Sequence, residues 1–168
     1  FYQMQDARYL ESFADAAALP VAYGTALRMM VTNGHVSKGE KVLILGASGG
    51  VGVCCLQLAK LAGCEVIACA GTDAKAARLR ELGADKTINY VEKDFMKEIF
   101  AMYGKPTRRG SGTDQGVDVV VNYTGGDTWV NSLKTLKVGG RLLTCGATAG
   151  YAPTEDIRFI WTFELQII

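Results

Sequence analysis

The sequence predicts an α/β fold, a doubly wound parallel sheet with helices on both faces. Three observations support this prediction. Apolar runs such as 41–45 and 117–123 show no alternation of polar and apolar residues, which is typical of strands covered on both faces. Helical segments separate these runs along the chain, as in a parallel sheet with right-handed crossovers. A turn with four glycines in seven residues, 46–52, joins the first run to the next helix.

The first predicted helix covers residues 20–33, because Pro20 suits a first turn and Gly34 follows as a stop signal. The glycine turn opens a second helix, which runs to about residue 62 and stops at Gly63. Other elements of this half are strands at 41–45, 65–70 and 86–90 and helices at 73–83 and 93–104.

The second half repeats the alternation. The polar segment 105–116 has no apolar anchor and is predicted to be a mobile loop. The predicted elements after it are a strand at 117–123, a helix at 128–136, a strand at 141–147 after the turn Gly139-Gly140, and a last strand at 163–168.

Length and charge point to one globular domain over residues 1–168. The 18 Lys and Arg residues nearly balance the 17 Asp and Glu residues, so we expect no nucleic-acid or membrane partner. Lys41 and Arg109 are interpreted as solvated surface. No run is long enough to cross a bilayer. Because the chain begins at Phe1 and ends within a predicted strand, we expect it to be part of a longer protein.

The five cysteines are interpreted as small buried thiols of a cytoplasmic protein. Their number is odd, no Cys-x-x-Cys motif occurs, and each lies in an apolar stretch. The one histidine, His35, has no cysteine or carboxylate cluster near it in the sequence. We therefore expect no zinc in this chain.

The glycine turn predicts a phosphate-binding site. Between a strand and its helix, such a turn presents backbone N–H groups and a helix N-terminus to a pyrophosphate. Gly49 lets the backbone approach the phosphates, and Gly52 lets the helix pack closely on the sheet. The strict Gly-x-Gly-x-x-Gly pattern fails at its first position, which is Ala47. The strand–turn–helix context still favours dinucleotide binding over an unrelated tight turn.

The residues after the second strand favour NADP(H) over NAD(H). A cofactor with a free ribose 2′-hydroxyl usually meets an acid here, but the residues are Ala70, Gly71 and Thr72. Thr72 suits a helix cap. Lys75 places a cation in the first turn of the next helix, where the helix dipole disfavours it and a 2′-phosphate would offset the cost. The alternative is that Lys75 is an ordinary solvated side chain.

Five ordered blocks resemble one superfamily across almost the whole chain. The blocks are AAALPVAYGTAL, KVLILGASGGVG, ELGADKTINY, VDVVVNYTGG and GGRLLTCGATAGY. They are similar to the Rossmann cofactor-binding domain of medium-chain dehydrogenases/reductases, and most of all to quinone oxidoreductase-like and zinc-type alcohol dehydrogenase-like members. The resemblance implies a second, GroES-like domain, absent here, that supplies most catalytic residues. The catalytic residues are therefore unknown.

The resemblance assigns four groups of cofactor-binding residues. The pyrophosphate group is Ser48, Gly49, Gly50 and Val51; the 2′-phosphate group is Gly71, Thr72, Lys75 and Tyr90; the ribose group is Tyr123 and Thr124; the nicotinamide group is Cys145, Gly146 and Ala147. Tyr90 taken alone fits a half-buried strand-end tyrosine equally well.

The resemblance also implies hydride transfer between a nicotinamide and a small molecule with a carbonyl or activated alkene, such as a quinone, enone or alcohol. Ala17 stands where the zinc-dependent branch usually has a cysteine ligand, which favours zinc-free chemistry. The last strand implies a homodimer, because it commonly pairs with its copy and would otherwise leave an open edge.

Two alternatives from other classes stay open. An S-adenosylmethionine-dependent methyltransferase also has a glycine-rich turn after its first strand, but it generally needs an acid at the end of the second, which Ala70–Thr72 lack. A non-catalytic redox sensor that binds dinucleotide and changes partners is equally compatible with the turn.

Overall fold

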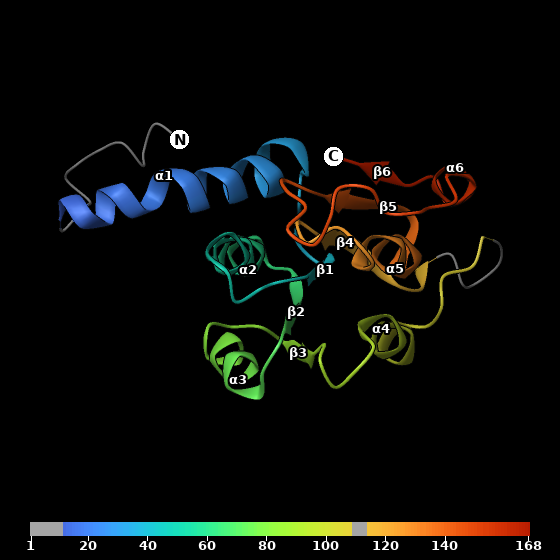
Figure 1. The fold of residues 1–168 in the computed structure, drawn as a ribbon, viewed down its shortest axis with the longest axis horizontal. Coiled ribbons are helices and arrows are strands. Elements are labelled where there is room, and N and C mark those ends of the chain that lie inside the picture. The colour runs from blue at the N-terminus through green and yellow to red at the C-terminus, as the bar shows by residue number, and fades with distance from the viewer. Residues whose placement is uncertain (1–11, 109–113) are drawn as a thin grey trace.

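The computed structural model describes residues 12–108 and 114–168 and contains the predicted parallel sheet (Figure 1). Six strands lie in the order β3-β2-β1-β4-β5-β6, and every neighbouring pair is parallel. Arg109 and residues 110–113 of the predicted mobile loop fall outside the described residues. The strands are β1 (Lys41–Ile44), β2 (Glu65–Ala70), β3 (Lys86–Asn89), β4 (Val117–Val121), β5 (Leu136–Leu143) and β6 (Gln166–Ile167).

Helices cover both faces of the sheet, as Figure 1 shows with α2 and α3 on one side and α4 and α5 on the other. The helices are α1 (Phe13–Leu27), η3 (Arg28–Asn33), α2 (Gly50–Ala62), α3 (Asp73–Glu81), α4 (Phe95–Tyr103), α5 (Thr128–Thr135) and α6 (Arg158–Thr162). None of the helices in the described part of the chain is long and apolar enough to span a membrane.

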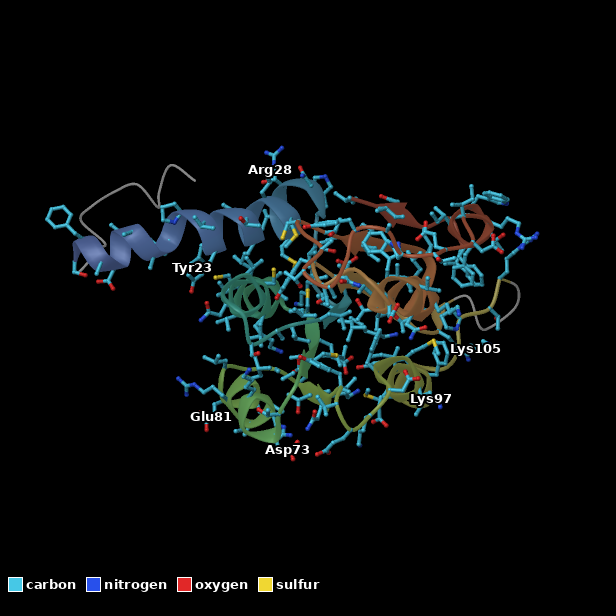
Figure 2. The ribbon with its side chains drawn as sticks, viewed as in Figure 1. Tyr23, Arg28, Asp73, Glu81, Lys97 and Lys105 are labelled. Atoms are coloured by element: carbon cyan, nitrogen blue, oxygen red, sulfur yellow. The ribbon has the colours of Figure 1, made fainter. Side chains whose placement is uncertain are left out.

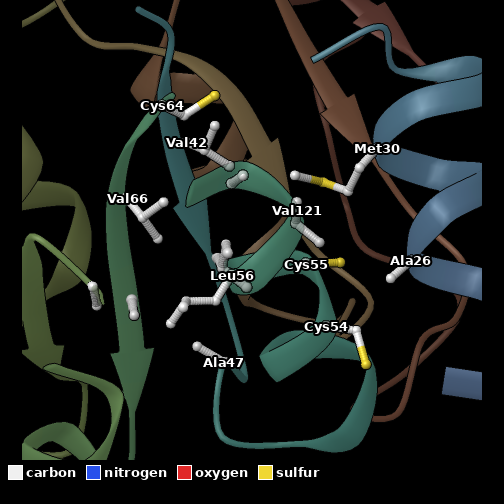
Figure 3. Packing of buried hydrophobic residues seen from close by; sticks show 14 of the residues in the cluster. Ala26, Met30, Val42, Ala47, Cys54, Cys55, Leu56, Cys64, Val66 and Val121 are labelled. Carbon is white, nitrogen blue, oxygen red and sulfur yellow. The ribbon is translucent and has the colours of Figure 1, made fainter. Parts of the chain in front are cut away.

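Two hydrophobic cores lie on opposite faces of the sheet, because successive strand residues point to opposite sides. Val42 and Ile44 belong to the core under α1 and α2, whereas Leu43 and Leu45 belong to the core under α4 and α5. Figure 3 shows the first core, in which Leu56 of α2 packs over the strands. The absence of alternation in the sequence runs reflects this burial on both faces.

The first helix begins earlier than predicted. It starts at Phe13, after Ser12, whose hydroxyl accepts a hydrogen bond of 3.2 Å from the amide of Asp15. Pro20 therefore lies inside α1 and not in a first turn. The predicted end is confirmed: η3, a π-helix, ends at Asn33 and is followed by its C-cap Gly34, where a Cβ would lie 2.4 Å from the carbonyl oxygen of Met29. The prediction missed the cap at Ser12.

The end of the sheet also differs from prediction. Strand β5 begins at Leu136, which was predicted as helix, and includes the predicted turn Gly139-Gly140. A register shift against β4 accommodates these glycines. Strand β5 ends at Leu143, so Cys145–Ala147 lie in the following loop and not in the strand. The predicted last strand at 163–168 is confirmed only as the two-residue β6, and the short helix α6 before it was not predicted.

Lys41 is not simply solvated surface. It is half-buried, and its ammonium lies 5.2 Å from the centre of the Tyr103 ring. The favourable field above an aromatic face explains this placement.

Candidate dinucleotide-binding site

The glycine turn lies between the end of β1 and the start of α2. Gly46 has a φ of +63°, which favours glycine, and its carbonyl oxygen accepts a hydrogen bond of 3.0 Å from the amide of Gly49. Gly49 is the N-cap of α2, and no side chain in the described residues caps that helix. Helix geometry leaves the amides of its first turn without intrahelical acceptors. Ser48, Gly49 and Gly50 are exposed, so the amides at the start of α2 are open to solvent, as the predicted phosphate site requires.

Close packing beneath this turn explains why position 52 is a glycine. A Cβ there would lie 2.5 Å from the hydroxyl oxygen of Tyr123, 2.6 Å from the carbonyl oxygen of Gly46 and 2.7 Å from the Cα of Ala47. The Tyr123 hydroxyl itself donates a hydrogen bond of 2.7 Å to the carbonyl oxygen of Gly46. Burial raises the pKa of Tyr123 well above its usual value, so the phenol stays protonated.

This contact places the ring of Tyr123 against the turn. The predicted ribose contact of Tyr123 would have to come from its backbone or from the exposed part of its ring. Val51, predicted beside the pyrophosphate, is half-buried at the start of α2 and packs against the core under α1.

The residues predicted for the 2′-phosphate meet at the end of β2. A Cβ at Gly71 would lie 2.8 Å from the hydroxyl oxygen of Tyr90, so the tyrosine covers this glycine. Thr72 is the N-cap of α3, and its hydroxyl accepts a hydrogen bond of 3.3 Å from the amide of Lys75. The predicted cap is therefore confirmed, and Lys75 is exposed beside it.

Asp73 changes the electrostatic argument for Lys75. It also lies in the first turn of α3, at the lower edge of the molecule in Figure 2, and its carboxylate complements the helix dipole there. That carboxylate accepts a hydrogen bond of 3.0 Å from the side-chain amide of Asn89. The penalty on Lys75 from the dipole is thus smaller than the sequence argument assumed, whereas the Asp73 carboxylate already has a partner.

A cavity of about 350 Å³ lies between Gly46 of the glycine turn and Tyr90 of the predicted 2′-phosphate group. It lies at the carboxyl ends of the strands, where doubly wound sheets bind ligands. Gly46, Tyr90 and Thr124 therefore line one cavity, although they are far apart in the sequence. The full lining is Leu45, Gly46, Tyr90, Lys93, Asp94, Phe95, Thr124, Asp127, Thr128 and Asn131.

The three residues predicted beside the nicotinamide follow β5. Cys145 is exposed, and a Cβ at Gly146 would lie 3.6 Å from the carbonyl oxygen of Tyr123. The hydroxyl of Thr144 donates a hydrogen bond of 3.1 Å to the carbonyl oxygen of Gly146. Ala147 is close to Gly125: a Cβ added to Gly125 would lie 2.9 Å from the Cβ of Ala147. This segment therefore packs on the loop after β4.

All five cysteines are free, and four of them are buried. Burial raises the pKa of Cys55 and of Cys69 to about 12, so these thiols stay neutral. The prediction of buried thiols is confirmed for all but Cys145, which is exposed because it lies after the end of β5. Within the described ranges, no group of three or more His, Cys, Asp and Glu residues is arranged to hold a metal ion.

Sequence reasoning missed Asn122, which the structure places at the end of β4 with no exposed surface. A signal for it exists. The amide side chain of Asn122 follows directly after the mostly apolar run VDVVV. The hydroxyl residues Thr128 and Ser132, which can bond to an amide, lie one turn apart in the next predicted helix.

Known proteins resemble this chain over most of its length. The model of a family described as zinc-binding dehydrogenase matches residues 50–168. A rat quinone oxidoreductase is 33% identical over 134 residues, which are 80% of this chain and 38% of that protein. The chain thus spans less than half the length of this curated relative.

Two solved structures share the fold at high similarity. An NAD-dependent alcohol dehydrogenase superposes with a TM-score of 0.81 at 38% identity, covering 94% of this chain and 43% of the other. The 2-octenoyl-CoA carboxylase reductase CinF, solved with NADP and 2-octenoyl-CoA, gives a TM-score of 0.78 at 30% identity and covers 91% and 37%. With the strand order and the glycine turn, these matches show that the chain belongs to the zinc-binding dehydrogenase family of the medium-chain dehydrogenase/reductase superfamily and corresponds to its cofactor-binding domain.

Proposed function

We propose that this chain is the NADP(H)-binding domain of an oxidoreductase that transfers hydride between a nicotinamide and a small molecule with a carbonyl or activated alkene. The observation that carries the proposal is the exposed start of α2, which no described side chain caps, beside a cavity at the carboxyl ends of the strands. Family membership favours this reading over a methyltransferase.

The preference for NADP(H) rests on the end of β2. No acid stands at Ala70–Thr72, and the nearest carboxylate, Asp73, is hydrogen-bonded to Asn89. Lys75 is exposed in the first turn of α3, and Tyr90 covers Gly71 beside it. A ligand phosphate at this position would gain a cation and the capped helix start. Among similar structures, one was solved with NADP and another is named NAD-dependent.

The chemistry divides between cofactor and protein. A bound nicotinamide supplies the hydride, whereas the protein supplies position and electrostatics. Backbone amides at Ser48–Val51 would bind the pyrophosphate. Tyr90 and Thr124 line the cavity that would hold the nucleoside. The segment Cys145–Ala147 would face the nicotinamide. We propose that catalytic groups and the substrate pocket belong to a second domain of the whole protein.

Calorimetric titration with NADPH and NADH at fixed salt tests the proposal. We expect tighter binding of NADPH, and we expect Lys75→Ala to reduce the affinity for NADPH but not for NADH. Lys97→Ala is a matched control, because Lys97 is also exposed at the third position of a helix and its amide also donates to an N-cap side chain, that of Asp94. Binding of neither nucleotide by the folded chain would contradict dinucleotide binding, and equal binding would contradict the 2′-phosphate site.

Because the proposal places the catalytic groups in a second domain, we expect the 168 residues by themselves to bind NADPH but to oxidise it slowly or not at all with a quinone or enone. Steady NADPH oxidation by the purified chain would contradict this part of the proposal. A whole protein with nucleotide-dependent association and no reductase activity would instead support the redox-sensor alternative.

A further inference from the structure

Asn122 is a completely buried amide whose hydrogen-bonding groups all have partners. Its Oδ1 atom accepts hydrogen bonds from the backbone amides of Thr124, at 2.9 Å, and Gly125, at 3.0 Å. Its Nδ2 atom donates to the hydroxyls of Ser132, at 2.9 Å, and Thr128, at 3.1 Å. The orientation of the amide is fixed, because only the oxygen can accept from two backbone N–H groups.

The donor side of Asn122 connects the loop to α5. The hydroxyl of Ser132 donates a hydrogen bond of 2.8 Å to the carbonyl oxygen of Thr128 and therefore accepts from Asn122 with a free lone pair. The hydroxyl of Thr128 donates a hydrogen bond of 2.6 Å to the carbonyl oxygen of Gly125. One side chain thus holds the backbone of the β4–α5 loop on one side and the first two turns of α5 on the other.

The β4–α5 loop in turn holds the loop after β5. Three backbone hydrogen bonds join them: the amide of Thr148 donates to Tyr123, that of Ala149 to Thr124 and that of Gly126 to Gly150, at 3.3, 2.7 and 3.0 Å.

The fit between the two loops is close. A Cβ at Gly125 would lie 2.5 Å from the carbonyl oxygen of Gly150, and Gly125 itself has a φ of +68°. A change in the first loop therefore displaces the second.

We propose that Asn122 is a positioning residue of the cofactor site: through the amides of Thr124 and Gly125 it fixes both Thr124, which lines the cavity, and the segment Cys145–Ala147, which packs on that loop. The inference rests on the proposed function, since it names a residue that would shape the site without touching the ligand. Each half of the side chain has a separate role. The oxygen orders the site loops, and the nitrogen attaches them to α5.

This division can be tested with three variants of the 168-residue chain. Asn122→Leu keeps a similar side-chain volume and removes the hydrogen bonds of both the oxygen and the nitrogen. Asn122→Asp keeps the acceptor oxygens, and the hydroxyls of Thr128 and Ser132 can rotate to donate to it. Ser132→Ala removes one donor-side partner and leaves the loop amides bonded, so it controls for lost stability. Should Asn122→Leu fail to fold, Asn122→Ser takes its place, because a serine hydroxyl is too short to reach both amides.

Two measurements are compared across these variants: NADPH affinity, followed by the fluorescence of the reduced nicotinamide, and amide hydrogen exchange of the loops. We expect Asn122→Leu to weaken NADPH binding by about tenfold or more and to speed exchange at 123–127 and 147–150, but not in β1 and β4. We expect Asn122→Asp to keep both the NADPH affinity and the slow loop exchange of the wild type. We expect Ser132→Ala to lower the melting temperature without changing the affinity.

The possible failures are distinguishable. If the wild-type chain binds NADPH and Asn122→Leu binds it equally well, the positioning role is wrong and the proposed function stands. The role is also wrong if Ser132→Ala loses as much affinity as Asn122→Leu at an equal loss of melting temperature. If the folded wild-type chain binds neither NADPH nor NADH, the proposed function fails and the positioning role fails with it.

Discussion

The hydroxyl of Tyr123 donates a hydrogen bond of 2.7 Å to the carbonyl oxygen of Gly46, which joins the end of β4 to the glycine turn after β1. We predict that Tyr123→Phe lowers the free energy of unfolding by about 1 kcal/mol, because the half-buried carbonyl of Gly46 then keeps only the hydrogen bond from the amide of Gly49. We also expect several-fold weaker NADPH binding, since the turn loses a restraint. Urea unfolding and calorimetry measure the two effects.

The matched control for that prediction is Tyr23→Phe. The hydroxyl of Tyr23, which Figure 2 labels on α1, donates to the side-chain oxygen of Gln57 at 2.5 Å and does not touch the turn. The Tyr23→Phe variant should lose stability without losing NADPH affinity. Equal affinity loss in both variants would show that the effect of Tyr123→Phe is not local to the turn.

Replacing Gly52 with alanine should be strongly destabilising. The added Cβ would meet two backbone atoms, the carbonyl oxygen of Gly46 and the Cα of Ala47, which cannot rotate away. We expect a loss of about 1–3 kcal/mol in unfolding free energy, as for other overpacked sites. Thermal and urea unfolding measure it.

Gly50→Ala is the informative comparison. The nearest atom to its added Cβ is the Cβ of Ala22 at 3.6 Å, an ordinary contact, and position 50 begins α2. Stability should stay the same or rise slightly. A loss of NADPH affinity without a loss of stability would then support a close approach of the pyrophosphate. A Gly52→Ala protein as stable as the wild type would refute the packing argument.

Acid should weaken the ion pair between Asp85 and Lys60, whose ammonium lies 2.8 and 2.7 Å from the two carboxylate oxygens. Partial burial by itself would raise the pKa of Asp85, but hydrogen bonds from Lys60 and from the amide of Val66 lower it below its usual 3.8. The contribution to stability is therefore complete above that usual pKa and is lost as pH falls through the lowered folded-state value.

Asp85→Asn should consequently cost less than about 1 kcal/mol at neutral pH, because both partners are partly exposed, and should flatten the acid limb of the stability curve. Urea midpoints measured from pH 7 to pH 2 test this. Glu81→Gln, which makes the same charge change in the exposed pair with Arg78, is the control. An unchanged acid limb in Asp85→Asn would contradict the assignment.

Among the described strands, β6 pairs only with β5, so Gln166 and Ile167 form an open edge of the sheet in this part of the chain. The side chain of Ile167 is 41% exposed. We predict a homodimer through this edge, and we expect Ile167→Lys to convert it to a monomer, because a charge at the edge opposes strand pairing. Sedimentation measures the mass. A monomeric wild-type chain at high concentration would contradict the prediction.

Much of the fold follows from local patterns in the sequence. Unbroken apolar runs gave the buried strands, Gly63 gave the end of α2, and the strand–turn–helix order placed Ser48–Val51 at a helix start. Such signals depend on a few neighbouring residues. The start of α1 was missed because Pro20 was interpreted as a first-turn residue, although it lies seven residues after the true start at Phe13.

The contacts that shape the candidate site were decided by the tertiary structure. The Tyr123 hydroxyl meets Gly46 across 77 residues, Tyr90 covers Gly71 only because β2 and β3 are paired, and Asn122 is bonded to a helix that begins after it. The first two of these contacts have no spacing that sequence periodicity can reveal, whereas Thr128 and Ser132 follow Asn122 one helical turn apart. The sequence by itself determined the alternating parallel fold and the glycine turn between strand and helix, because both follow from side-chain period and backbone freedom. Packing across the sheet decided which side chains support the turn, because those contacts form only once the strands have their register.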